Sequence, residues 1–160
     1  MIIRPATNAD HDAIWAIMAP VLKAGETYTL PDDWDHDTTL DYWFAKPHQV
    51  FVADDNGQIL GHYFLTPNRL GRGDHVANCG YMTAADATGK GVATAMCRHS
   101  LEIARDQGFR AMQFNSVVAT NHRAVALWQH LGFDIAGRLP GAFSHPTLGF
   151  VDLLVMYQLL

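Results

Sequence analysis

The segment Tyr81–Ala93 constrains the architecture of this chain more than any other part of the sequence. Its first residues continue a strand-like run, Gly89 and Gly91 follow in a turn, and a helix-like run begins at about Lys90. Glycine has no Cβ, so such a turn can bring several backbone N–H groups close to one anion, assisted by the helix N-terminus. The segment predicts either a phosphate or diphosphate cradle or a tight connection that merely needs glycine.

Two common phosphate-binding motifs do not fit this segment. A Walker A loop requires glycine where Ala84 stands and serine or threonine where Gly91 stands. A dinucleotide-binding fingerprint requires a third glycine where Thr94 stands, and it belongs early in a chain, not midway along it. Both of these nucleotide-binding folds are therefore excluded.

The apolar pattern of the remaining chain mixes strands with helices. Strands are predicted at 1–6, 50–53, 59–65, 75–83, 110–118, 133–137 and 150–157. Helices are predicted around 14–21 and at about 40–45, 90–107 and 121–131. The Asn56-Gly57 pair is typical of a hairpin turn. Because no linker or repeat interrupts this order, we expect one α/β (α+β) domain over residues 1–160, with a mixed sheet layered by helices.

The charge balance and the cysteine and histidine content restrict the partners. Eleven Lys and Arg residues stand against sixteen Asp and Glu residues, which disfavours binding to nucleic acid. No apolar run is long enough to cross a membrane, and the first residues do not form a signal peptide, so we expect a cytoplasmic protein. The two cysteines, Cys79 and Cys97, and the scattered histidines form no metal-ligand pattern, so no metal is expected.

Two motifs resemble those of the GNAT acyltransferases. The pyrophosphate loop of that family, Gln/Arg-x-x-Gly-x-Gly/Ala, is similar to Thr88-x-x-Gly91-x-Ala93. The family pattern Asn-x-x-Ala-x-x-Leu-Tyr-x-x-Leu-Gly-Phe is similar to residues 121–133, and the order of elements matches over nearly the whole chain. The resemblance implies a sheet of about seven strands, helices on both faces, and a splay between the fourth and fifth strands. It also implies acetyl-CoA as co-substrate and direct attack of an amine on the thioester.

The resemblance assigns a set of residues to the CoA site, with pantetheine pairing to the strand before the turn. They are Met82, Thr83, Thr88, Gly89, Lys90, Gly91, Val92, Ala93, Asn121 and Trp128. Thr88 replaces the usual Arg or Gln, which leaves backbone N–H groups, with Lys90, to hold the diphosphate. Trp128 replaces a tyrosine that many members use as general acid, and indole is too weak an acid for that role. The group that protonates the thiolate is therefore open.

Asn78 and Asn115 each lie in an otherwise apolar strand segment, where an unpaired amide is costly. In the GNAT fold the two strands concerned splay apart, and the thioester and the amine meet in the gap. The pair are thus candidate catalytic residues that bind substrate and polarise the thioester carbonyl. The alternative is that each amide only satisfies a neighbouring strand.

The acceptor amine is expected to contact Glu26, Thr27 and Tyr28 after the first helix, and Phe143 before the last strand. Shorter stretches at 75–81, 114–118 and 137–142 resemble fungal acetyltransferases that act on azetidine-2-carboxylate and other proline-like amines. We expect specificity to reside in loops at 24–36 and 139–149. The alternative function is a catalytically weak, CoA-binding regulatory module. For the oligomeric state, we expect that the strands after residue 132 could pair in a homodimer.

Overall fold

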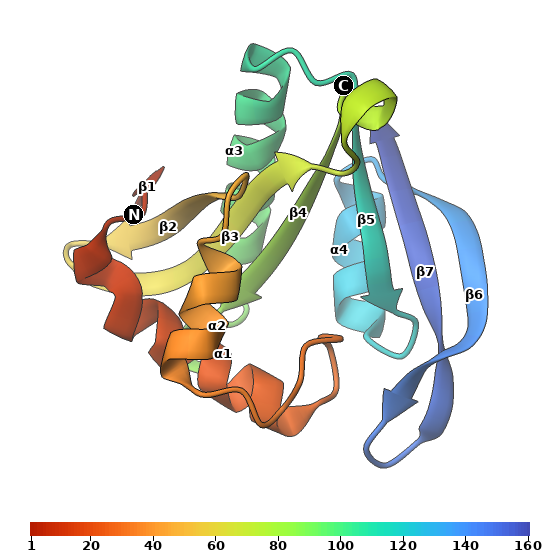
Figure 1. Cartoon of the computed structure of the whole chain (residues 1–160), viewed down its shortest axis with the longest axis horizontal. Coiled ribbons are helices and arrows are strands. Elements are labelled where there is room, and N and C mark those ends of the chain that lie inside the picture. The colour runs from red at the N-terminus through yellow and green to blue at the C-terminus, as the bar shows by residue number, and fades with distance from the viewer.

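The computed structural model describes residues 1–160 and contains one seven-stranded sheet, in the order β1-β2-β3-β4-β5-β7-β6 (Figure 1). The strands are β1 (Ile2–Pro5), β2 (Gln49–Asp55), β3 (Gln58–Pro67), β4 (Val76–Thr83), β5 (Ala111–Val118), β6 (Asp134–His145) and β7 (Gly149–Leu159). The helices are α1 (His11–Ala24), α2 (His36–Trp43), α3 (Val92–Asp106) and α4 (His122–His130). The predicted mixed sheet of seven strands is confirmed.

Strands β4 and β5 form the parallel pair of this sheet, and they pair over a very short distance. Their register joins only Val76 to Ala111 and Ala77 to Met112. Beyond these residues the two strands diverge toward their C-terminal ends, as Figure 1 shows. The structure thus contains the predicted splay between the fourth and fifth strands, and one edge of β4 is left without a strand partner.

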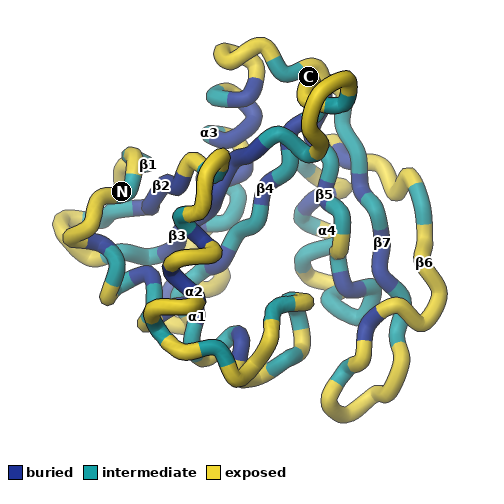
Figure 2. The backbone as a smooth tube through the Cα atoms, viewed as in Figure 1, coloured by how far each residue is buried: buried dark blue, intermediate teal, exposed yellow.

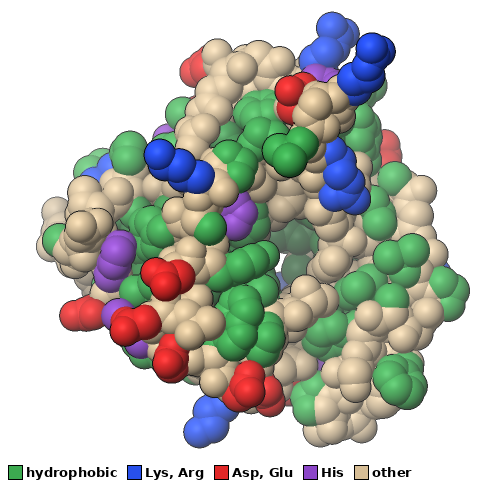
Figure 3. Space-filling model, viewed as in Figure 1, with side chains coloured by type: hydrophobic (Ala, Val, Ile, Leu, Met, Phe, Trp, Pro, Cys, Tyr) green, Lys and Arg blue, Asp and Glu red, His purple; other side chains and the backbone are tan.

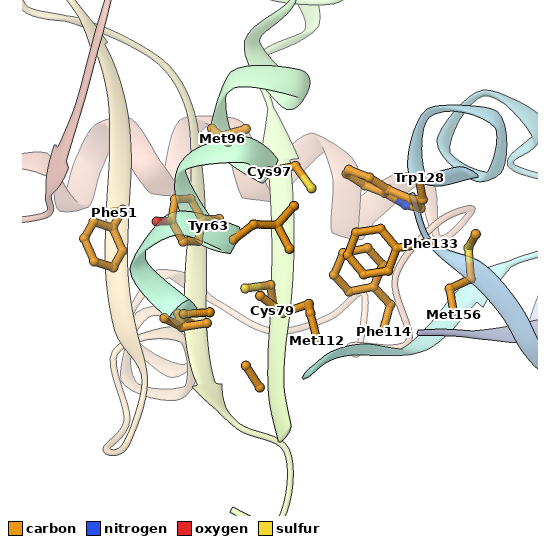
Figure 4. Close-up of a cluster of buried hydrophobic side chains, with 14 of the residues drawn as sticks. Phe51, Tyr63, Cys79, Met96, Cys97, Met112, Phe114, Trp128, Phe133 and Met156 are labelled. Atoms are coloured by element: carbon orange, nitrogen blue, oxygen red, sulfur yellow. The ribbon is translucent and has the colours of Figure 1, made fainter. Parts of the chain in front are cut away.

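The helices cover both faces of the sheet, and each face has its own apolar core. Helices α1 and α2 bury Met18 and Trp43 against Val52 and Phe64 of the sheet. On the other face, the core under α3 and α4 contains the side chains drawn in Figure 4. None of the helices is long and apolar enough to cross a membrane.

The starts of α2 and α3 differ from the prediction. Helix α2 begins at His36, four residues before the predicted start, because the Asp35 side chain caps it by accepting from the Thr38 N–H at 2.9 Å. Helix α3 begins at Val92, because Gly89 and Gly91 have φ of +83° and +79° and so cannot be helical. The glycines therefore belong to the turn.

The C-terminal hairpin is longer than predicted. A short strand at 133–137 and a loop at 139–149 were predicted, whereas β6 extends to His145 and pairs with β7 as far as Gly149. Two register shifts interrupt the pairing, which lets a strand with Pro140 and Gly141 continue across them. Strand β6 forms an exposed edge of the sheet (Figure 2). Pairing of this region in a homodimer stays a prediction.

Candidate functional site

The free edge of β4 offers backbone groups to the gap. Hydrogen bonds from Asn68 N to Val76 O (2.7 Å) and from Ala84 N to Leu60 O (2.9 Å) fix the antiparallel pairing with β3. Because backbone groups alternate in direction along a strand, the even-numbered residues of β4 bond to β3. The backbone groups of Cys79, Tyr81 and Thr83 therefore face the gap, whereas that of Met82 faces β3.

A cavity of about 510 Å³ opens at the splay, between the α1–α2 segment and the ends of β4 and β5. Its mouth is visible as the hollow at the centre of Figure 3. It has no charged side chain and no histidine in its lining. Polar groups there are amides and hydroxyls, among them Asn78, Asn115 and Thr27, and aromatic rings line the α1–α2 side. The aromatic rings on this side are Tyr28, Tyr42, Trp43 and Phe64, while Tyr81, Phe114 and Trp128 line the side of the gap.

Asn78 and Asn115, the two predicted catalytic amides, both line this cavity. The Asn78 Nδ2 donates to the backbone O of Gln113 at 2.8 Å, and so ties β4 to β5 just past their last paired residues. Asn115 lies in a β-bulge, since Phe114 pairs with Met156 but Val117 with Leu154. Bulges re-aim side chains, and this one places Asn115 in the cavity lining. Both amides thus have structural partners and also border the gap.

A second cavity, of about 500 Å³, lies between the glycine turn and α4. The first helical bond of α3 joins Ala95 N to Gly91 O at 3.0 Å, so the N–H groups of residues 92–94 have no partner within the helix. Apart from Gly91 and its two chain neighbours, no atom lies within 4 Å of the Cβ position of Gly91. The turn therefore presents open backbone donors and a helix N-terminus, which suits an anion.

A cation also borders this second cavity, and it is not the predicted one. Arg123 on α4 lines the cavity, with its Nη2 3.5 Å from the Cβ position of Gly89. Lys90 is exposed and absent from the lining. Thr88 lines both cavities, with its Oγ1 3.4 Å from the Ala84 carbonyl oxygen. The positive charge over the turn therefore comes from α4.

Trp128 lies where the two cavities join. It is 8 % exposed and packs against Tyr81 and Phe114, with ring centroids 5.1 Å and 5.2 Å away. The cavities share several lining residues, namely Tyr81, Thr83, Thr88, Asn121, Ala124 and Trp128. A ligand can thus extend from the turn, along the free edge of β4, into the uncharged cavity.

Tyr28 fastens the loop between α1 and α2 to this edge. Its hydroxyl donates to the carbonyl oxygen of Tyr81 at 2.8 Å. A Cβ at Gly80 would lie 2.6 Å from the Phe64 ring and 3.2 Å from the Tyr28 hydroxyl, so this approach needs glycine. Burial raises the pKa of Tyr28 well above its usual range. The side chain is therefore a neutral hydrogen-bond donor.

The other predicted site residues divide between the two cavities and the exterior. Thr27 lines the first cavity, and Val92 and Ala93 line the second. Glu26 is exposed and absent from both linings. Phe143 is 6 % exposed and lies in a separate small core with Val118 and Leu153, because the predicted loop around it is a strand.

Asn121 and Cys79 both have structural roles. Asn121 caps α4, its Oδ1 accepting from Ala124 N at 3.2 Å, and also lines both cavities. Burial raises the pKa of the Cys79 thiol well above its usual range, so this residue is not a reactive thiolate.

Sequence reasoning missed Arg123, Asn68 and Gln113. The sequence could have pointed to Arg123, because it follows the capping Asn121 by two residues. It therefore lies in the first turn of α4, beside any ligand at that end of the helix. Asn68 lies in the loop after β3, 47 residues from its partner Asn115, so no local pattern marks it. Gln113 lies two residues before Asn115 in β5, and this spacing was visible in the sequence. The aromatic wall likewise combines three separate elements.

Known proteins with similar sequences identify the family of this chain. The model of the Acetyltransferase (GNAT) family matches residues 14–133. The chain belongs to the GNAT family. N-acetyltransferase aca1 of Schizosaccharomyces pombe is 33 % identical over 137 residues, covering 76 % of this chain and 66 % of that protein. The chain thus spans slightly less than two thirds of this relative.

Two further GNAT proteins align over most of their length. The L-amino acid N-acetyltransferase AaaT of Escherichia coli is 27 % identical over 138 residues, with 86 % of this chain and 85 % of that protein covered. The structure of a GCN5-related N-acetyltransferase from Kribbella flavida superposes with a TM-score of 0.95 at 42 % identity, covering 99 % of this chain and 97 % of that one. The GNAT fold is therefore established for this chain.

Proposed function

We propose that the protein is an acetyl-CoA-dependent N-acetyltransferase whose acceptor is a small amino acid or a related amine. Membership of the GNAT family supports acetyl transfer. The observation that carries the proposal is the free edge of β4, which runs from an anion-binding turn into an uncharged cavity lined by amides. An extended thioester with a diphosphate at one end fits such a path.

The diphosphate of CoA would bind at the turn Thr88–Ala93. The N–H groups of residues 92–94 are free to donate, and the helix N-terminus favours negative charge there. Arg123 adds a cation. The pantetheine arm would then add to the edge of β4 as an extra strand, pairing with backbone groups of Tyr81 and Thr83. Trp128 would pack beside the arm at the junction.

The reaction would be a direct transfer. The amine nitrogen attacks the thioester carbonyl carbon, a C–N bond forms, the C–S bond breaks, and CoA leaves as a thiolate. The amine loses one proton and the thiolate gains one. Because no carboxylate, histidine or lysine lines the cavity, we propose that water carries both protons. An N–H of Asn115 would stabilise the developing oxyanion, and Asn78 would hold the amine.

The cavity lining supports a small acceptor with an apolar body. Four aromatic side chains form one wall, and a ring face can also attract an ammonium group. Acidic side chains gather on the lower left of the view in Figure 3, and the aspartates at 32, 33, 35, 37 and 41 are all exposed. This acidic surface attracts cationic amines toward the protein. The name of the Escherichia coli relative and the resemblance to enzymes of proline-like amines both favour amino acids.

Release of CoA thiol tests the proposal. Purified protein is mixed with acetyl-CoA and a panel of proline analogues, polar amino acids and polyamines. We expect amine-dependent thiol release with at least one amino acid and an acetylated product by mass spectrometry. CoA binding without turnover on the whole panel would instead favour the regulatory module.

A matched pair of glycine variants tests where CoA binds. Gly91→Asp places a negative side chain at the diphosphate, and calorimetry should then detect no CoA binding. Gly108→Asp is the control, because Gly108 has a similar φ of +84° and an equally open Cβ position after the far end of α3. Equal CoA affinity in the two folded variants would contradict the assignment.

A further inference from the structure

The cavity at the splay has no anionic side chain that could pair with an ammonium ion. No carboxylate, histidine, lysine or arginine belongs to its lining. Its titratable groups are those of Tyr28, Tyr42, Cys79 and Tyr81. Burial raises the pKa of Tyr28, Cys79 and Tyr81 well above their usual ranges, so these three groups are neutral. The lining therefore supplies no counter-charge for a cationic acceptor.

The part of the cavity where the acceptor must react is enclosed by buried side chains. The attacking nitrogen has to reach the free edge of β4, beside Cys79, Phe114 and Trp128, all of which are buried. Trp43 and Phe64 on the opposite side are buried as well. An ammonium ion that enters this space loses much of its hydration, and a ring face returns only part of that loss. The neutral form of an amine is therefore favoured at the edge of β4.

The charged groups around the cavity do not change this preference. Arg123 borders the adjoining cavity, and its positive charge opposes a second cation. Glu26 and the aspartates at 32–41 are exposed and lie outside the lining. These carboxylates can attract an ammonium ion to the surface, but they do not accompany it inside. The ion therefore leaves its proton in the solvent before its nitrogen reaches the thioester.

We propose that the enzyme selects weakly basic acceptors, which are amines that are largely uncharged near neutral pH. The inference rests on the proposed acetyl transfer and narrows its acceptor class. Each pKa unit by which a free amine exceeds the pH lowers its uncharged fraction about tenfold, and no group of the lining offsets that loss. The uncharged nitrogen attacks the thioester carbon and then releases one proton to water. The thiolate takes one proton from water, so the products are the acetylated amine and CoA thiol.

Proline and thiazolidine-4-carboxylate are a matched pair of acceptors for testing this proposal. Both are five-membered cyclic amino acids with the same carboxylate, and the ring sulfur of the second withdraws electrons and lowers the pKa of its amine. At pH 7 we expect kcat/KM to be about tenfold or more higher for thiazolidine-4-carboxylate. For each acceptor, kcat/KM should rise with pH and level off above the pKa of that acceptor. The two profiles should therefore have different midpoints.

Glu26→Gln is the control variant for these profiles. Glu26 precedes Thr27, which lines the cavity, but Glu26 itself is exposed and outside the lining. Both midpoints in this variant should match those of the wild-type protein. A shifted midpoint would show that the Glu26 carboxylate takes the proton of the acceptor, which overturns the proposal.

The other outcomes are equally decisive. One midpoint common to the two acceptors would reveal an ionisable group of the enzyme and overturn the proposal. A higher kcat/KM at pH 7 for proline, or for the strongly basic polyamines, would also overturn it. If other amines of the panel react instead, a preference for the more basic of two similar amines at pH 7 has the same meaning. Absence of acetyl transfer to every amine would instead contradict the proposed function, so the two failures are distinguishable.

Discussion

His62 should make the protein sensitive to mild acid. This residue of β3 is 0 % exposed, and neither ring nitrogen has a hydrogen-bond partner. The Trp43 ring packs edge-on against it with a centroid distance of 5.1 Å. Burial disfavours the imidazolium and lowers the pKa of His62 from 6.5 to about 3. The folded protein thus keeps the ring neutral over a pH range in which the unfolded chain binds a proton.

The sign and size of the effect follow from this difference. Because the unfolded state binds more protons below pH 6.5, the free energy of unfolding falls as the pH falls, until the folded-state pKa is reached. Between about pH 7.5 and pH 5 the expected loss is about 2 kcal/mol, from the ratio of proton binding in the two states. Further acidification should continue the loss toward about pH 3.

Urea unfolding at the two pH values measures the loss. The variant His62→Phe has a ring of similar size that cannot titrate, so it should lose about 2 kcal/mol less than wild type over this interval. The variant His75→Gln is the control, because His75 is exposed, and its pH dependence should match wild type. If wild type and His62→Phe lose equal free energy, then His62 is not buried in its neutral form and the reasoning is wrong.

Three further changes address the site. Trp128→Phe retains the aromatic packing and removes the indole N–H, so turnover should fall less than about tenfold; a thousandfold loss in the folded variant would identify Trp128 as an essential donor. Asn115→Ala should lower kcat about a hundredfold with CoA affinity near wild type by calorimetry; a lower melting temperature with nearly normal kcat would show a structural role only. Arg123→Gln should weaken CoA binding about tenfold, as expected for one lost ionic contact to phosphate, with kcat near wild type; unchanged affinity would exclude Arg123 from the CoA site.

Local backbone requirements were legible in the sequence. Asn56 and Gly57 both have positive φ in the hairpin that their dipeptide predicted. Gly89 and Gly91 likewise have positive φ in the predicted turn, and Asn121 caps α4. Each of these features depends on a few consecutive residues, because the demand comes from backbone sterics or from unpaired N–H groups within one helical turn.

Elements whose form depends on distant partners could not be predicted. Strand β6 contains Pro140 and a run of small residues that reads as a loop, yet it continues because β7 supplies a partner along its length. Phe143 was expected at the acceptor site because it was predicted to lie in that loop. It instead packs against Val118 in a small core of its own. Pairing between strands overrides local propensity, so such segments are decided by tertiary structure.

The site shows the same division. The sequence by itself determined the strand–turn–helix unit, the two candidate amides and the family resemblance. Each of these depends on a short run of consecutive residues. Only the tertiary structure decided that Arg123 lies over the turn and that Asn68 contacts Asn115. The physical reason is that these contacts join segments far apart in the chain, since Asn68 lies in a loop 47 residues from Asn115.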